Sequence, residues 1–193
     1  MVVMEPIDLP IPAWDGTGEL APVGKLEVHR RGLRHPAVSV FVLRDDQILI
    51  QKRAAGKYHT PGLWANTCCT HPMWGESAAD CAQRRLAEEL GIAGLFLRHA
   101  GQAEYRAEVP GFAEPLIEHE LVEVFVGEAT WPIDIRLDPA EVASVRWVAL
   151  EELRDEIALQ PQDFTPWLRI YLQEHAKMIF SGSALSEAVQ DFS

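Results

Sequence analysis

The sequence predicts an α+β fold, because strand and helix patterns follow one another in an order that is not a strict alternation of strand and helix. Runs rich in β-branched and aromatic residues predict strands over residues 37–43, 48–52, 121–126 and 144–148. Helical patterns predict helices over residues 77–90, 150–158, 166–178 and 184–190.

The first part of the chain is mostly extended. Prolines punctuate residues 1–24, which we interpret as an extended lead-in. Asp45-Asp46 turns the first strand into the second. Glycines and prolines spaced through residues 56–75 predict a loop with a short extended piece over 67–71.

The helix over 77–90 has the clearest limits. Ser77 can cap it, Asp80 follows three residues later in the manner of a capping box, and Gly91 ends it. A chain of 193 residues with 48% hydrophobic content and no internal repeat suits a single domain over 1–193. We assign no function to its C-terminal tail, residues 180–193.

Composition excludes several classes of partner. The net charge of −12 falls entirely on residues 108–193, since residues 1–107 carry equal numbers of acids and bases. Nucleic acid is an unexpected partner for such a chain, although a small anion can bind its first half. No apolar run reaches 18 residues, the N-terminus lacks a signal-peptide pattern, and three cysteines cannot build a disulfide framework. We therefore expect a cytoplasmic protein that does not bind a membrane.

The stretch WANTCCTHPMWGE, residues 64–76, contains two adjacent cysteines and a histidine. In an extended chain side chains alternate, so Cys69 and His71 face one way while Cys68 and Thr70 face the other. This alternation argues against a redox pair at the two cysteines. We interpret Cys68 as a packed residue and Cys81, on the helix, as buried and inert.

A second alternating stretch, LIEHELVEVF, places Glu118 and Glu120 on one side and His119 on the other. Burying two carboxylates at the start of an apolar face costs free energy unless they are paired or bind metal. His29 and His35 precede the first strand, and with His71 the chain offers three imidazoles and two carboxylates, a set suited to Mn, Fe or Zn. Spacing alone does not bring these residues together, and each single histidine is more often structural.

The helix over 77–90 carries charges in a familiar order. Arg84 lies over Glu88 and Arg85 over Glu89, each four residues apart, which by itself indicates a surface helix with ion pairs. The order from Glu76 to Ile92 also resembles most of the Nudix box, a loop–helix–loop that holds Mg²⁺ against a diphosphate. Thr70 stands where the box has its first glycine and Arg85 where it has a glutamate, so the resemblance implies weak hydrolysis.

From Lys25 to Leu172 the chain resembles the type 1 isopentenyl-diphosphate isomerases, the Nudix-fold branch that needs a divalent metal and no flavin. The most specific segment is PGLWANTCCTHP, which begins at Pro61. QKRAAGK, ending at Lys57, and RRLAEELGI, beginning at Arg84, agree with it. The resemblance implies a Nudix-type α/β/α sandwich with a mixed sheet flanked by helices.

The resemblance also implies roles for single residues. One divalent metal, Mn²⁺ or Zn²⁺, would be held by His29, His35, His71, Glu118 and Glu120. A Mg²⁺ ion bound with the substrate would be held by Glu89 and the carbonyl of Cys69. The diphosphate would contact Lys25, Arg53, Lys57 and Arg85, where arginine suits forked contacts and lysine acts as a point charge. The partner implied is a small diphosphate, and the chain a monomer or weak homodimer.

The implied reaction interconverts isopentenyl and dimethylallyl diphosphate in isoprenoid biosynthesis. It adds a proton at C4 and removes one from C2 through a carbocation-like intermediate, so it needs an acid and a base on opposite sides of the hydrocarbon and no water. The resemblance nominates Cys69 and Glu120 as this pair. Tyr105 would hydrogen-bond Glu120, and Trp167 would stabilise the cation.

Two other functions remain open at this point: a Nudix diphosphatase acting on a nucleotide-type substrate, which Arg85 disfavours, and a Nudix-type binding module without catalysis. Pro36 stands where such isomerases often have a basic residue, a departure that we treat as minor. Trp64, Trp74 and Trp147 are expected in the core or in a pocket wall.

Overall fold

The computed structural model describes residues 9–109, 115–130 and 132–189. Its strands are β1 (Pro10–Trp14), β2 (Leu20–Gly24), β3 (His35–Arg44), β4 (Gln47–Arg53), β5 (Trp64–Ala65), β6 (Cys68–Thr70), β7 (Leu97–Val109), β8 (Leu116–Glu128) and β9 (Val142–Ala149). Its helices are α1 (Lys25–Arg31), α2 (Ala78–Leu90), α3 (Leu150–Leu159), α4 (Pro166–Glu174) and α5 (Ala176–Phe180), with a 3₁₀ turn at Pro161–Asp163.

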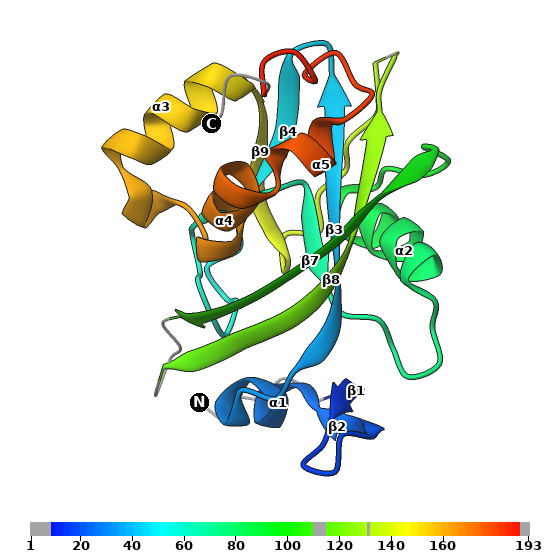
Figure 1. The fold of residues 1–193 in the computed structure, drawn as a ribbon. Helices are drawn as coiled ribbons and strands as arrows, with labels where there is room; N and C mark the ends of the chain where they lie inside the picture. The colour runs from blue at the N-terminus through cyan, green and yellow to red at the C-terminus, as the bar shows by residue number, and fades with distance from the viewer. Residues whose placement is uncertain (1–8, 110–114, 131, 190–193) are drawn as a thin grey trace.

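One mixed sheet forms the centre of the molecule (Figure 1). Its strands follow the order β5-β4-β3-β8-β7, with β6 paired to β3 and β9 paired to β4. β3 and β8 run parallel, and their register sets His35 opposite Glu120. The other pairs in this sheet are antiparallel. The predicted mixed sheet is confirmed.

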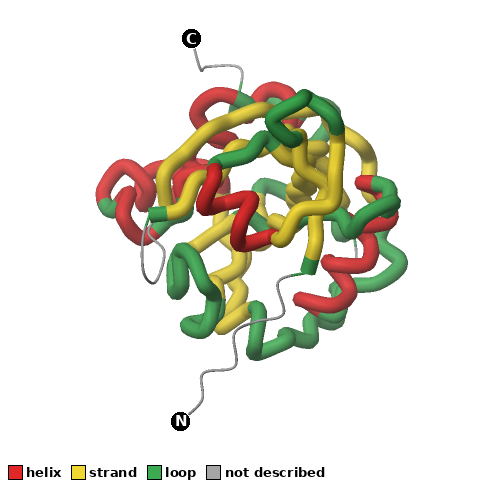
Figure 2. The backbone as a smooth tube through the Cα atoms, turned by 90° about the horizontal axis from the view of Figure 1, so that it is seen from below, coloured by secondary structure: helices red, strands yellow, loops and turns green. Residues whose placement is uncertain are grey.

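Helices cover both faces of this sheet (Figures 1 and 2). Alternate residues of β3 supply two hydrophobic cores: Phe41 packs in the core that includes residues of α3, α4 and α5, and Val40 packs in the core that includes residues of α2. Both side chains are fully buried, as expected for a strand between two apolar layers. The α/β/α sandwich expected from the sequence is therefore present.

The lead-in is more ordered than predicted. β1 and β2 pair as an antiparallel hairpin, and α1 follows directly at Lys25. Ile11 and Ala13 of β1 and Val28 of α1 form a small buried cluster between these elements. Residues 1–8 of the predicted lead-in lie outside the described residues. α1 was not predicted, because it has seven residues and no side-chain hydrogen bond at its N-cap, Gly24.

α2 follows the prediction closely. The Ser77 hydroxyl accepts a hydrogen bond from the backbone N–H of Asp80 at 3.1 Å, and the Asp80 carboxylate accepts one from Ser77 at 2.6 Å. Gly91 ends the helix in the left-handed region, with φ of 68°. Cys81, Leu86 and other apolar side chains of this helix are buried against the sheet.

Three local predictions need correction. The helix expected over 166–178 is two helices, α4 and α5, separated at His175, which has non-helical dihedral angles. Residues 184–189 form turns and no helix, and residue 190 lies outside the described residues. Trp74 is 51% exposed in a turn and lines no core, whereas Trp64 and Trp147 are half-buried and pack against the two cores. Within the described ranges, no helix is long and apolar enough to cross a membrane.

Candidate active site

Five donor side chains from four parts of the chain meet at one end of the sheet. His29 lies on α1, His35 begins β3, His71 follows β6, and Glu118 and Glu120 lie on β8. One ligand atom from each can be chosen such that all five lie within 4.8 Å of one another. The same-side placement predicted for the two glutamates is confirmed, since both are buried.

The short distances in this cluster join nitrogen to carboxylate oxygen. His29 Nε2 lies 3.2 Å from Glu118 Oε2, and His71 Nε2 lies 3.0 Å from Glu120 Oε1. His35 Nε2 lies 3.1 Å from His71 Nε2 and 3.6 Å from Glu120 Oε1. Three imidazoles and two carboxylates thus converge on one small volume.

The backbone orients two of these imidazoles. Nδ1 of His29 lies 2.6 Å from the carbonyl oxygen of Lys25, and Nδ1 of His35 lies 2.7 Å from that of Leu33. A carbonyl can only accept, so each Nδ1 carries the proton. Each Nε2 is then left with its lone pair directed into the cluster, which is the arrangement that metal-ligating histidines use.

Burial and charge act against each other here. Burial opposes ionisation of Glu120, but the neighbouring imidazoles of His35 and His71 outweigh this and hold its pKa well below the ordinary value. Burial and the nearby Lys25 ammonium lower the pKa of His71 well below its ordinary value. Glu120 is therefore an anion at neutral pH, and His71 a neutral imidazole.

The cluster fits a divalent cation. His29 Nε2 and both carboxylate oxygens of Glu118 are buried atoms without a hydrogen-bond partner in the described structure. Burying such atoms costs free energy unless a cation or a hydrogen-bond donor interacts with them. Mixed imidazole and carboxylate donors suit Mn²⁺, Fe²⁺ or Zn²⁺ better than Mg²⁺.

His59 also reaches this cluster and was missed by sequence reasoning. Its Nε2 lies 3.3 Å from Glu118 Oε1, and its ring stacks on that of His29 with centroids 5.7 Å apart. Burial and the Arg53 guanidinium lower its pKa well below the ordinary value. Only its position two residues after the QKRAAGK motif could have drawn attention to it.

The predicted catalytic side chains share a cavity of about 30 Å³ beside the cluster. Cys69, Tyr105, Glu120 and Trp167 all line it. The Tyr105 hydroxyl donates to Glu120 Oε2 at 2.6 Å. Trp167 is 2% exposed at the start of α4, with the Arg53 guanidinium 5.4 Å from its ring centroid.

The Cys69 thiol is held by two further side chains. Its Sγ donates to Asn66 Oδ1 at 3.0 Å and lies 2.8 Å from Ser39 Oγ, which in turn lies 2.8 Å from the Tyr171 hydroxyl. Burial raises the pKa of this thiol above its ordinary value, so it rests protonated. Asn66 belongs to the PGLWANTCCTHP segment and Ser39 to the strand predicted over residues 37–43, but nothing in their spacing assigned them this contact.

The four predicted diphosphate-binding cations line the same cavity: Lys25, Arg53, Lys57 and Arg85. They come from α1, the end of β4, the loop after it and α2. Burial and the neighbouring Lys57 lower the pKa of Lys25 to about 8. Mutual repulsion of this kind indicates a site built for an anion.

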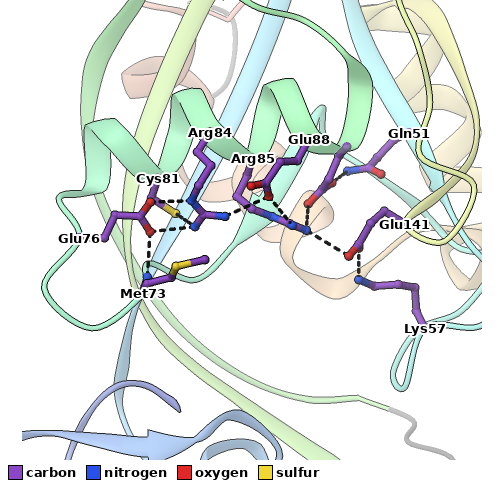
Figure 3. Close-up of polar contacts among 10 residues, drawn as sticks. Gln51, Lys57, Met73, Glu76, Cys81, Arg84, Arg85, Glu88 and Glu141 are labelled. Carbon is purple, nitrogen blue, oxygen red and sulfur yellow. Dashed lines mark hydrogen bonds and ion pairs between the residues drawn. The ribbon is translucent and has the colours of Figure 1, made fainter. Parts of the chain in front are cut away.

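The charges of α2 form an ion-pair chain (Figure 3). Arg84 makes forked contacts with Glu76 at 2.6 and 2.8 Å and reaches Glu88 at 3.0 Å. Arg85 reaches Glu88 at 2.9 Å and Glu89 at 2.6 Å, so both predicted four-residue pairs are confirmed. Glu89 lies outside the five-residue cluster.

The second oxygen of Glu89 faces the sheet. It accepts a hydrogen bond from Gln51 Nε2 at 3.1 Å, and the Glu89 side chain is almost fully buried. Arg85, which replaces the Nudix-box glutamate, thus fills the space beside this buried carboxylate with positive charge. The sequence did not assign Gln51 a role.

A wider groove of about 310 Å³ adjoins the inner cavity. It shares Lys25, Lys57 and Arg85 with that cavity, and Glu141 lines only the groove. Leu9 and the first two residues of the N-terminal hairpin, Pro10 and Ile11, line one side of it. Lys25, Lys57 and Arg85 therefore line both this outer groove and the inner cavity, whereas Arg53 lines the inner cavity alone.

Comparison with known proteins places the chain within a family. The model of the NUDIX domain matches residues 33–168. An isopentenyl-diphosphate Delta-isomerase of Rhodobacter capsulatus is 60% identical over 170 residues, which cover 88% of this chain and 94% of the relative. The protein of that name from Dinoroseobacter shibae is 58% identical over 176 residues, covering 91% of this chain and 98% of the relative.

Solved structures support the fold alone. A MutT NUDIX hydrolase from Burkholderia pseudomallei superposes with a TM-score of 0.56 at 23% identity, covering 74% of this chain and 98% of that one. RenU, a Nudix hydrolase from M. smegmatis, has a TM-score of 0.55 at 18% identity and covers 86% of this chain and 92% of its own.

Proposed function

This chain belongs to the Nudix family and, within it, to the isopentenyl-diphosphate Delta-isomerases, and we propose that it moves the double bond with Cys69 and Glu120 as its acid–base pair. The reaction interconverts isopentenyl and dimethylallyl diphosphate. The observation that carries the proposal is that both side chains line one cavity together with Tyr105 and Trp167.

The two groups begin in complementary states. The buried Cys69 thiol retains its proton and can donate one, whereas Glu120 is held as a carboxylate and can accept one. Adding a proton at C4 and removing one from C2 leaves the double bond between C2 and C3. Each turnover thus needs one group that has a proton and one that lacks it. In the reverse direction the two roles exchange.

Water must be kept from the intermediate, because it would trap a tertiary cation. At about 30 Å³ the cavity holds one or two water molecules, so we expect its lining side chains to move apart when the five-carbon chain enters. Tyr105, bonded to Glu120, keeps that carboxylate directed at the cavity. The buried Trp167 ring offers a face that stabilises positive charge by roughly 0.5–2 kcal/mol.

The His/Glu cluster is proposed to hold one divalent cation, Mn²⁺ or Zn²⁺, through His29, His35, His71, Glu118 and Glu120. When bound, such an ion would fix the orientation of Glu120 and neutralise the buried carboxylates. A Mg²⁺ ion brought with the diphosphate is proposed to bind Glu89 and the carbonyl of Cys69. Buried atoms of His29 and Glu118 lack a hydrogen-bond partner in the described structure, which supports the assignment of a divalent cation to this cluster.

The diphosphate is proposed to bind Lys25, Arg53, Lys57 and Arg85. These residues give a chain of net charge −12 a locally basic site, which overrides the overall charge at short range. The positive Arg85 beside Glu89 also disfavours the alternative of a Nudix diphosphatase.

Free cysteines in the structure support a cytoplasmic location, and a monomer or weak homodimer remains our expectation.

The direct test is incubation of the protein with isopentenyl diphosphate and Mg²⁺, followed by NMR of the products. Signals of dimethylallyl diphosphate, without release of phosphate, are expected. Release of phosphate without an allylic product would assign the site to hydrolysis. Binding without any product would assign it to a non-catalytic module.

A further inference from the structure

Glu141, the residue before β9, lies between two of the diphosphate-binding cations. Its Oε1 is 3.3 Å from Arg85 Nη2, and its other oxygen forms an ion pair with the Lys57 ammonium (Figure 3). Lys57 comes from the loop after β4 and Arg85 from α2, so one carboxylate joins two separate elements. No motif in the sequence pointed to it.

The backbone of Glu141 holds this side chain in place. Its carbonyl accepts a hydrogen bond from the N–H of Ala54 at 3.0 Å, and its own N–H donates to the carbonyl of Asp138 at 3.0 Å. The first of these bonds ties it to the loop that carries Lys57. The carboxylate is thus built into the site before any ligand arrives.

Its location places it on the groove side of two of the cations. Lys57 and Arg85 line both the inner cavity and the outer groove, whereas Glu141 lines only the groove. An anion that approaches these cations from the groove meets a carboxylate already paired with both. Burial disfavours the charge, but Lys57 and Arg85 outweigh it and lower the pKa of Glu141 to about 2.

We propose that Glu141 is a positioning residue that acts as an internal counter-ion, competing with the diphosphate for Lys57 and Arg85 and promoting its release. This inference rests on the proposed diphosphate site. The isomerisation leaves the diphosphate chemically unchanged. The protein therefore binds the diphosphate group of the substrate and that of the product equally tightly. Such uniform binding does not speed the reaction, and it slows release of product. When the Glu141 carboxylate pairs again with Lys57 and Arg85, it weakens their binding of the diphosphate and so favours release of the product.

The test measures binding of inorganic pyrophosphate by calorimetry at a fixed Mg²⁺ concentration, with no isomerase assay involved. Glu141→Gln keeps the size of the side chain and removes its charge. Glu88→Gln is the matched control, because Glu88 also contacts Arg85, at 2.9 Å, but lines neither space. Glu141→Asp, which retains the charge on a shorter side chain, is a second variant that is less demanding on the fold.

Pyrophosphate is expected to bind Glu141→Gln about three- to tenfold more tightly than wild type, as expected for loss of one or two partly exposed ion pairs. Glu141→Asp should gain less, and Glu88→Gln should stay within about twofold of wild type. In the isomerase assay Glu141→Gln should lower KM and kcat together, which a merely structural defect would not do.

Weaker or unchanged binding by Glu141→Gln, or an equal gain in Glu88→Gln, would overturn the proposal. Should Glu141→Gln fail to fold, Glu141→Asp decides alone, and binding no tighter than wild type then counts against it. Failure of the wild type to bind pyrophosphate at all would contradict the diphosphate site itself, and so the proposed function.

Discussion

Cys68 and Cys69 are neighbours in the chain and face opposite sides of the sheet. Cys68 is fully buried in the core beneath α2, whereas the Cys69 thiol lines the inner cavity within hydrogen-bonding distance of Ser39 and Asn66. Strand alternation alone therefore separates a packing residue from a candidate catalytic residue. The two thiols should differ sharply in reactivity.

Alkylation should distinguish the cysteines. Iodoacetamide is expected to modify Cys69 and to leave Cys68 and Cys81 unmodified, since both of these are fully buried. Because burial raises the pKa of Cys69, its rate of modification should increase with pH throughout the neutral and alkaline range. Peptide mass spectrometry gives the site, and pyrophosphate should slow the reaction. Modification of Cys68 at an equal rate would contradict this placement.

Tyr105→Phe should impair catalysis more than binding. The variant loses the 2.6 Å hydrogen bond to Glu120 and keeps the buried ring. A hydrogen bond to a charged group is worth about 1.5–3 kcal/mol, so kcat should fall roughly 10- to 100-fold with little change in KM. Steady-state kinetics provide the measurement. A change confined to KM would assign Tyr105 to substrate binding.

Removal of metal should destabilise the protein. Within the part of the chain that the structure describes, Glu118 and His29 keep buried atoms without hydrogen-bond partners, which a divalent cation would satisfy. Dialysis against a chelator should lower the melting temperature by about 5–10 °C relative to protein with metal at about 100 times its Kd. Mn²⁺ should restore it. Glu118→Gln should bind less metal by elemental analysis, while a melting temperature insensitive to chelator would argue against the cluster as a metal site.

Acid should break the ion pairs of Glu141 with Lys57 and Arg85 over a defined pH range. The pKa of Glu141 falls from 4.5 to about 2 on folding, because Lys57 and Arg85 outweigh the effect of burial. The stabilisation is complete above pH 4.5 and disappears as pH falls toward 2, where the native carboxylate takes up its proton. For a side chain that is 25% exposed we expect about 1–2 kcal/mol.

Urea unfolding measured between pH 5 and pH 2 checks this window. Glu141→Gln should lose less stability over that range than wild type, and the difference should vanish at the acidic end. Parallel curves for the two proteins would contradict the assigned shift.

Much of the fold could be predicted because its signals are local. Ser77 and Gly91 mark the ends of α2, and alternation placed Glu118 and Glu120 on one buried face. β7 was missed because a bulge between His99 and Gly101 interrupts its register and only three of its 13 side chains are buried. Periodicity is weakest where a strand is irregular.

The site was predictable only where a resemblance supplied what spacing could not. His59 and Glu141 carry no local signal, since tertiary packing alone brings them to Glu118 and to Lys57. Trp74 was misplaced for a similar reason. It lies in the turn that ends at Gly75, which has a φ of 81°, and its ring is exposed. Aromatic character indicates burial only on average.

Cys69 and Glu120 are proposed to exchange protons with the carbon skeleton of the substrate. The most direct measurement is NMR of isopentenyl diphosphate incubated with Cys69→Ala, beside wild type and the control Cys81→Ala. Cys69→Ala should keep its fold and metal content and form dimethylallyl diphosphate about 10²- to 10⁴-fold more slowly or not at all, whereas Cys81→Ala should remain active. Turnover by Cys69→Ala at the wild-type rate would contradict the assignment of Cys69 to the acid–base pair.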